Sequence, residues 1–244
     1  MVEKKKVCVI GAGVSGLAAA NAFRERGHEV HVVERGADLG GVWEPSRSYP
    51  DVQTQSPKDL YRYTSMAMPD DYPEWPKGTQ VHAYLKTYAG RNGLVPLIRY
   101  GTKVVSMRRR DGAKGWSVGL AAGDGQTVSE DFDFVAVCTG NFSEKRELVH
   151  PGQDAFAAAG GQVLHSSEYN DPATVKGKRV VVLGFSKSAT DIAVNAVNSG
   201  AAGVTIVYLE PVWRIPYFIG TLSPSRWSGP TGGRWKACSR SSSS

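Results

Sequence analysis

The stretch that most constrains the fold of this 244-residue chain runs from Val7 to Glu34. Four apolar residues precede the glycine-rich segment Gly11–Gly16, and an alanine-rich segment and a second apolar segment follow it. This order predicts a strand, a tight turn, a helix over residues 17–26 and a second strand over residues 29–34. A helix that begins at such a turn binds pyrophosphate at its N-terminus, so the stretch predicts a dinucleotide-binding fold.

Each glycine of this turn has an expected role. Gly11 allows the turn, Gly13 lets a phosphate approach the backbone, and Gly16 lets the helix pack closely on the strand, with Ser15 between them. Glu34 ends the second strand, where an acid accepts hydrogen bonds from an adenosine ribose. The motif alone is a weak signal, and a turn that only connects a strand to a helix is the alternative.

Composition predicts a globular chain of one or two domains, with 41% hydrophobic and 21% charged residues. The net charge of +6 raises the question of nucleic acid. The dense basic runs, residues 4–6 and 108–110, lack interleaved aromatic residues, so we expect no nucleic-acid partner. A basic chain also suits anionic dinucleotides.

The cysteines Cys8, Cys138 and Cys238 lack a CxxC spacing, which predicts neither a disulfide framework nor a metal site. The first strand begins near residue 7, which leaves no room for a signal peptide, and no apolar run has the length of a membrane span. We therefore expect a soluble, cytoplasmic protein.

The middle of the chain holds two further candidate ligand contacts. After Glu34, Gly40 and Gly41 permit a close approach to a flat or phosphorylated ligand, which Trp43 could cover. Residues 132–138 predict a buried strand that ends in Thr139-Gly140, at the carboxyl edge of the sheet where ligands bind. An ordinary strand end is the alternative there.

Between these contacts, the proline-rich and aromatic residues 45–78 predict a structured wrapping segment without long elements. Apolar periodicity predicts a helix over residues 79–92. Short strands are predicted at residues 97–99, 103–108 and 115–121.

The opening pattern returns after a linker over residues 148–177. Residues 178–183 predict a strand, Gly184–Ala189 the turn, residues 190–198 a helix and residues 204–208 a further strand. Ser186 replaces the middle glycine, and its side chain either holds the pyrophosphate away from the backbone or donates its hydroxyl to it. Ala189 replaces the last glycine, where alanine is tolerated.

These motifs together resemble the N-terminal half of the flavin-containing monooxygenase family, most closely its plant members. The resembling stretches are the first glycine turn, Gly40–Trp43, residues 72–76, Cys138–Gly140, residues 161–169 and the second glycine turn. The resemblance implies an α/β chain with two Rossmann-like dinucleotide-binding folds, the second incomplete. It places an FAD-binding domain at residues 1–147, the linker at 148–177, a partial NAD(P)-binding unit at 178–218 and a disordered tail at 219–244.

In that family NADPH reduces FAD, and molecular oxygen adds to give a C4a-hydroperoxyflavin. This species oxygenates a small substrate at nitrogen, sulfur or a carbonyl. The implied cofactor-binding residues are Gly11, Gly13, Ser15, Gly16, Glu34, Arg35, Gly41, Val42, Trp43, Thr139, Gly140, Gly184, Ser186, Ser188, Ala189 and Arg214.

Three departures from the family qualify these expectations. Gln55 stands where many members have an asparagine that supports the oxygenated flavin, so we expect Gln55 in this catalytic role with more leakage to hydrogen peroxide. Leu209-Glu210 stands where an arginine grips the 2′-phosphate of NADPH, so NADH is also possible unless Arg214 substitutes. Family members are about twice as long, so we expect unpaired sheet edges and exposed apolar faces.

Two other functions stay open at this point. One is a catalytically silent fragment that only binds dinucleotides. The other is a different two-dinucleotide flavoprotein, such as a reductase, although the three cysteines supply no redox-active pair.

Overall fold

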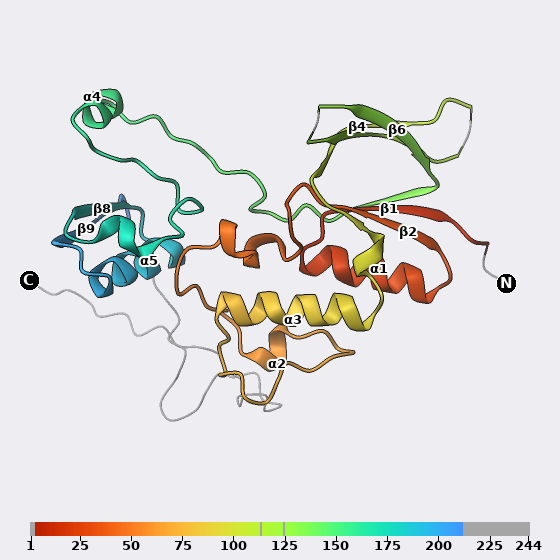
Figure 1. The fold of residues 1–244 in the computed structure, drawn as a ribbon, viewed down its shortest axis with the longest axis horizontal. Coiled ribbons are helices and arrows are strands. Elements are labelled where there is room, and N and C mark those ends of the chain that lie inside the picture. The colour runs from red at the N-terminus through yellow and green to blue at the C-terminus, as the bar shows by residue number, and fades with distance from the viewer. Residues whose placement is uncertain (1–2, 113, 124, 212–244) are drawn as a thin grey trace, which may run out of the picture. The chain divides into compact units, whose positions relative to one another are not determined.

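A four-stranded parallel sheet organises the N-terminal part of the chain (Figure 1). The computed structural model describes residues 3–112, 114–123 and 125–211, which lie within one compact unit that ends at residue 212. The strand order is β3 (Ile98–Arg99), β2 (Glu29–Val33), β1 (Lys6–Ile10) and β7 (Phe134–Val137). β1 is therefore central, and the residues after it lie at the carboxyl edge of the sheet.

Two long helices, α1 (Val14–Glu25) and α3 (Gly78–Arg91), contribute the helical side of the main core. In Figure 1 they run side by side below the strands. Val9, Val32, Leu17 and Val81 are fully buried in this core. Because buried apolar area is the main source of stability, this packing fixes where α1 begins relative to β1.

Between these elements lie the short helices η1 (Gly41–Trp43), η2 (Pro45–Arg47), α2 (Lys58–Tyr61) and η3 (Val95–Leu97). The predicted wrapping segment thus holds only short elements, as its proline content indicates. An antiparallel sheet of β4 (Thr102–Arg109), β5 (Trp116–Ala122) and β6 (Thr127–Phe132) forms a second small core with β1 and β2, around Cys8, Val33 and Phe132.

The C-terminal described part is a second βαβ unit, made of β8 (Arg179–Leu183), α5 (Lys187–Asn198) and β9 (Gly203–Val207). β8 and β9 pair in parallel over their whole length. The segment before them contains α4 (Gln153–Ala158) and η4 (Pro172–Val175). The α/β class with two Rossmann-like units is therefore confirmed.

Three expectations from the sequence were wrong in detail. Residues 132–138 are not one buried strand: Phe132 ends β6, and β7 is an edge strand whose Phe134 and Val137 are 50% and 60% exposed. β6 itself was missed, because its alternation is largely polar with only Phe132 buried. Both helices that follow a glycine turn begin three residues earlier than expected, within the turn itself.

The two strands of the second βαβ unit expose apolar side chains. Val181, Leu183 and Val207 of the β8–β9 pair are 61%, 56% and 50% exposed. This agrees with the expected unpaired edges. No helix among the described residues is long and apolar enough to cross a membrane.

Candidate functional site

The first glycine turn is shaped by close backbone packing. Gly11 has φ +102, and its amide donates to the Val33 carbonyl at 2.8 Å. A Cβ on Gly11 would lie 2.6 Å from the Cys138 carbonyl oxygen, and a Cβ on Gly16 would lie 1.8 Å from the Gly11 carbonyl oxygen. Any side chain at either position therefore collides with backbone, which explains both glycines without reference to a ligand.

Gly13 differs from these two because it leaves space. It is the N-cap of α1 with no side-chain cap, and a Cβ there would meet only the Gly41 backbone, with Cα at 3.6 Å and N at 3.9 Å. The Gly40 amide donates to the Ala12 carbonyl at 3.0 Å, which holds the second glycine pair beside the turn. Two side-chain-free segments thus face each other at the N-terminus of α1, a suitable cradle for an anion.

Glu34 is the buried acid of this site, with 5% of its surface exposed. Its Oε2 accepts from the Ala12 amide and its Oε1 from the Gly36 amide, both at 2.8 Å. The carboxylate therefore holds the glycine turn and the segment after β2 in place. Each oxygen keeps a further lone pair that a ribose hydroxyl can use.

A cavity of about 500 Å³ is lined by Arg35, Gly36, Arg47 and Lys103 among others. Arg35 and Gly36 directly follow Glu34 in the chain. The Arg35 guanidinium contacts the Glu144 carboxylate and the Ser143 carbonyl. Because the lining also holds Arg47 and Lys103 and, among the described residues, contains no acidic one, the cavity wall is cationic. Arg47 and Lys103 were missed from the sequence because they come from separate segments that only the fold brings together.

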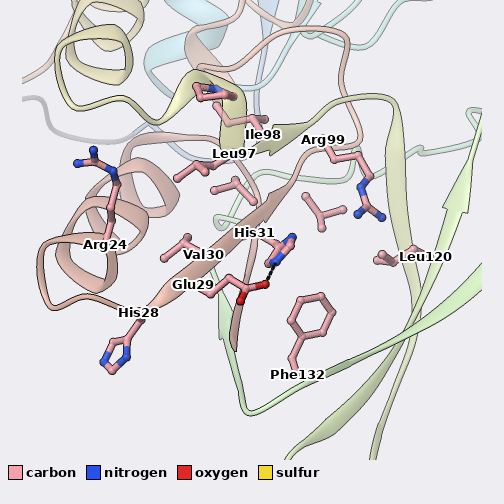
Figure 2. Close-up of a pocket in the computed structure, with 13 residues that line it drawn as sticks. Arg24, His28, Glu29, Val30, His31, Leu97, Ile98, Arg99, Leu120 and Phe132 are labelled. Carbon is pink, nitrogen blue, oxygen red and sulfur yellow. Dashed lines mark hydrogen bonds and ion pairs between the residues drawn. The ribbon is translucent and has the colours of Figure 1, made fainter. Parts of the chain in front are cut away.

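A larger cavity, of about 610 Å³, lies along β2 between α1 and the antiparallel sheet (Figure 2). Its lining includes Arg24, His31, Arg99 and Phe132, and His31 bonds Glu29 at 2.9 Å. No residue predicted to bind a cofactor lines it. The candidate site is therefore the glycine cradle with Glu34, and the smaller cavity, which is lined by Arg35 and Gly36, begins directly after Glu34 in the chain.

The remaining predicted residues of the first site differ in burial and in their contacts. Trp43 is 8% exposed and donates its indole N–H to the Tyr61 hydroxyl at 2.8 Å, so it is a core residue with little surface left to cover a ligand. Val42 is 46% exposed. Thr139 lies beside Gly11, and both Thr139 and Gly140 are exposed.

The second glycine turn repeats the first with looser packing. Gly184 has φ +115, and its amide donates to the Val207 carbonyl at 2.8 Å. Ser186 is the N-cap of α5, and Ser188 lies in the first turn of that helix. A Cβ on Gly184 would lie 3.9 Å from the Ala189 Cβ, an ordinary contact, so alanine fits at position 189.

Gln55 is exposed, and no hydrogen bond among the described residues links it to either glycine turn. Its neighbour Thr54 is 1% exposed, and the Thr54 hydroxyl has no partner in the described part of the chain. Arg214 and the predicted tail at residues 219–244 lie outside the described residues. Within the described ranges, no group of three metal-ligating side chains occurs.

The two described cysteines are free thiols with raised pKa values. Burial raises the pKa of the Cys8 thiol to about 11 and also raises the pKa of Cys138. Both are protonated at neutral pH, and thiol–disulfide chemistry requires the thiolate. This chemistry disfavours a reductase that works through these two cysteines.

A family model and curated relatives show one family. The model of the flavin-binding monooxygenase-like family matches residues 4–218. Flavin-containing monooxygenase 1 of Canis lupus familiaris is 37% identical over 203 residues, which cover 78% of this chain and 37% of the relative. The chain thus spans little more than a third of the length of this relative.

Solved structures also superpose well on the chain. S-allyl-L-cysteine S-oxygenase from Allium sativum matches with a TM-score of 0.72 and 26% identity, over 90% of this chain and 54% of that one. The structure named OTEMO in complex with FAD and NADP matches with a TM-score of 0.73 and 25% identity, over 86% of this chain and 39% of that one.

Proposed function

Because the chain belongs to the flavin-binding monooxygenase-like family, we propose that it binds FAD at the first glycine turn and NADPH at the second, as part of a flavin-dependent monooxygenase. The observation that carries this proposal is the cradle of Gly13 and Gly41 beside the buried carboxylate of Glu34. A dinucleotide offers a pyrophosphate and a ribose diol in that order.

FAD fits the residues of the first site. Its pyrophosphate would lie against Gly13 and Gly41, where a Cβ would otherwise intrude, and its adenosine ribose would donate to Glu34. The cationic cavity with Arg35, Arg47 and Lys103 adjoins Glu34 and would offset the negative charge of the cofactor. Ser15, Gly140 and Thr139 complete the edge of this site.

The second site would take the nicotinamide cofactor. Gly184, Ser186, Ser188 and Ala189 form the turn and first helical turn on which its pyrophosphate would lie. The Ser186 side chain replaces the open approach that Gly13 offers, so a hydroxyl donates here instead of bare backbone. Arg214 would contact the 2′-phosphate of NADPH, and NADH is the alternative cofactor.

Bound flavin supplies the electron transfer and the oxygen activation, which protein side chains alone lack. The chain's own residues would orient the two cofactors and exclude water. The Gln55 carboxamide would donate a hydrogen bond near the reactive edge of the isoalloxazine. It reaches one methylene further than asparagine, which moves the donor from a preorganised position.

For the substrate we propose a small molecule with a nucleophilic sulfur or nitrogen, with O2 as co-substrate. Support comes from relatives whose names state such chemistry, including the S-oxygenase of Allium sativum and a human protein named as a putative N-oxide-forming dimethylaniline monooxygenase. A carbonyl substrate is the third possibility within this family.

Gly13→Ala tests the cofactor site directly. The φ of Gly13 is −81, and a Cβ would contact only Gly41, so we expect the variant to fold with an unchanged melting temperature. The methyl group blocks the pyrophosphate, so we expect FAD affinity, measured by flavin fluorescence quenching, to fall at least about 10-fold. Gly90→Ala, at an open position in the last turn of α3, is the matched control.

Three results would contradict the proposal. Unchanged FAD affinity in Gly13→Ala would exclude the cradle as the pyrophosphate site. A wild-type chain that binds no FAD would exclude catalysis, and one that binds FAD without oxidising NADPH would function as a dinucleotide-binding protein.

A further inference from the structure

A hydrogen-bond cluster, with buried Asn195 and Tyr169 at its centre and exposed Asp51 at its edge, ties the loop after η2 to helix α5. The Asn195 side chain is 4% exposed and donates through Nδ2 to the Asp51 carboxylate at 2.7 Å. Its Oδ1 accepts from the Tyr169 hydroxyl at 2.6 Å. One turn earlier, Asp191 accepts from the Tyr49 hydroxyl at 3.0 Å. We call these five residues the α5 latch.

The latch holds its loop in a costly conformation. Asp51 has φ +58, the only positive φ at a residue other than glycine among those described. Such a conformation persists where surrounding contacts enforce it, and it often marks a functional position. The bond from Asn195 is a contact that stabilises Asp51 in this state. Tyr49 also packs with Tyr169 and Ala196 in a small apolar cluster.

The two ends of the latch lead to the two proposed cofactor sites. Asp191 and Asn195 are four residues apart on one face of α5, the helix that begins at the second glycine turn. On the other side, Asp51 continues directly into the segment that carries Gln55. That segment is held by hydrogen bonds from Gly78 to the Val52 carbonyl at 2.7 Å and from Thr54 to the Pro76 carbonyl at 3.1 Å.

We propose that the α5 latch positions the Gln55 segment relative to the nicotinamide nucleotide at the start of α5. Asn195 and Asp51 are thus positioning residues that contact neither cofactor. This inference rests on the proposed function, because it assigns Gln55 to the flavin and α5 to the nicotinamide cofactor. Its first test needs no cofactor.

Reversing the polarity of the Asn195–Asp51 bond gives a sharp test. In Asn195→Asp, two carboxylates face each other, so we expect amide hydrogen exchange in residues 46–57 to accelerate at least about 10-fold. In Asn195→Asp with Asp51→Asn, the amide donates from the other side, so exchange should return to within about twofold of wild type. Two variants serve as controls for the exchange measurement. Asp51→Asn alone keeps an acceptor for the Asn195 amide, and Asn198→Asp places the same charge at an exposed position of α5.

Tyr49→Phe removes one hydroxyl and keeps the ring, so it serves even where Asn195→Asp does not fold. It should accelerate exchange in the same segment about threefold. Unchanged exchange in the variants that fold, or acceleration in Asn195→Asp that Asp51→Asn does not rescue, would overturn the latch.

With flavin and NADPH present, the share of NADPH oxidation that ends as hydrogen peroxide should rise about threefold in Asn195→Asp and recover in the double variant. Faster exchange with an unchanged peroxide share would overturn the positioning role while leaving the cofactor sites standing. Absence of flavin binding in the wild type would overturn the proposed function and the role assigned to Gln55 with it, and the exchange measurement would still decide whether the latch holds its loop.

Discussion

The two βαβ units have the same turn but different surroundings. In both, the first glycine has a positive φ and donates to the last residue of the following strand, from Gly11 to Val33 and from Gly184 to Val207, each at 2.8 Å. The fingerprints align position by position from there. A local sequence pattern is therefore sufficient to build this turn twice.

The two units differ in how deeply their residues are buried at matched positions. Cys8 and Val181 occupy matched positions, each three residues before the first glycine of its turn. Cys8 is fully buried, whereas Val181 is 61% exposed. The first unit has apolar side chains packed on both faces of its sheet, one face against helices and one against the antiparallel sheet. The turn thus depends on local sequence, and its environment depends on segments far along the chain.

The largest predicted difference is at the last position of each fingerprint. Gly16→Ala forces a Cβ to within 1.8 Å of backbone, so we expect a loss of at least about 3 kcal/mol in unfolding free energy or a failure to fold. Ala189→Gly, at the matching position, should cost about 1–2 kcal/mol, from helix propensity and one lost methyl group. Urea unfolding followed by circular dichroism measures both.

Equal costs at the two positions would break the comparison, because they would mean that both turns are packed alike. Gly90→Ala controls for the substitution itself. It should stabilise α3 by about 0.5–1 kcal/mol, since the position is open.

The acid after the second strand gives the next largest effect. Glu34→Ala leaves the Ala12 and Gly36 amides without their acceptor, so we expect a loss of about 2 kcal/mol in unfolding free energy and weaker FAD binding. Tyr208, at the matching position of the second unit, is 46% exposed and packs against Phe185 with tilted rings whose centroids are 4.5 Å apart.

Tyr208→Ala should therefore cost less than about 1 kcal/mol. Thermal unfolding with and without FAD separates the two effects of Glu34. A variant that keeps its stability and its FAD affinity would show that Glu34 neither holds the turn nor binds the ribose.

Much of the fold and of the candidate site could be predicted from the sequence, because the relevant signals are local. The glycine turns, the acid at Glu34 and the strand–helix order follow from patterns within about 30 residues. The dual role of Glu34 was not readable, since its bond to Ala12 depends on how α1 packs. Arg47, Lys103 and the bond from Asn195 to Asp51 join distant segments, and nothing near each residue signals its partner.

The first unit also carries a titrating group where the second has Val181. Burial raises the pKa of Cys8 from 9.0 to about 11. Below pH 9 the thiol is protonated in both states and has no effect. Between pH 9 and 11 only the unfolded state releases the proton, so the unfolding free energy should fall with rising pH, by about 2 kcal/mol in total.

Cys8→Ala measures this contribution, because the difference between wild type and variant should shrink as pH rises through that window. Val181→Cys, at the exposed matching position, should leave the pH profile of unfolding unchanged. A difference that stays constant from pH 8 to 11 would show that Cys8 ionises in the folded state as readily as in the unfolded one.

The smallest predicted effect concerns cofactor choice in the second unit. Glu210 is exposed and follows β9, on the side where a nicotinamide ribose would lie. A carboxylate about 4 Å from a 2′-phosphate costs about 1 kcal/mol in water, so Glu210→Ala should raise the preference for NADPH over NADH about fivefold. Stability should stay within about 0.5 kcal/mol of wild type.

Steady-state oxidation of each cofactor gives the ratio of kcat/KM values. Glu147→Ala, which removes an exposed acid outside both units, is the control. An unchanged ratio would place the ribose away from Glu210, and the second fingerprint would then hold its nucleotide by the turn alone.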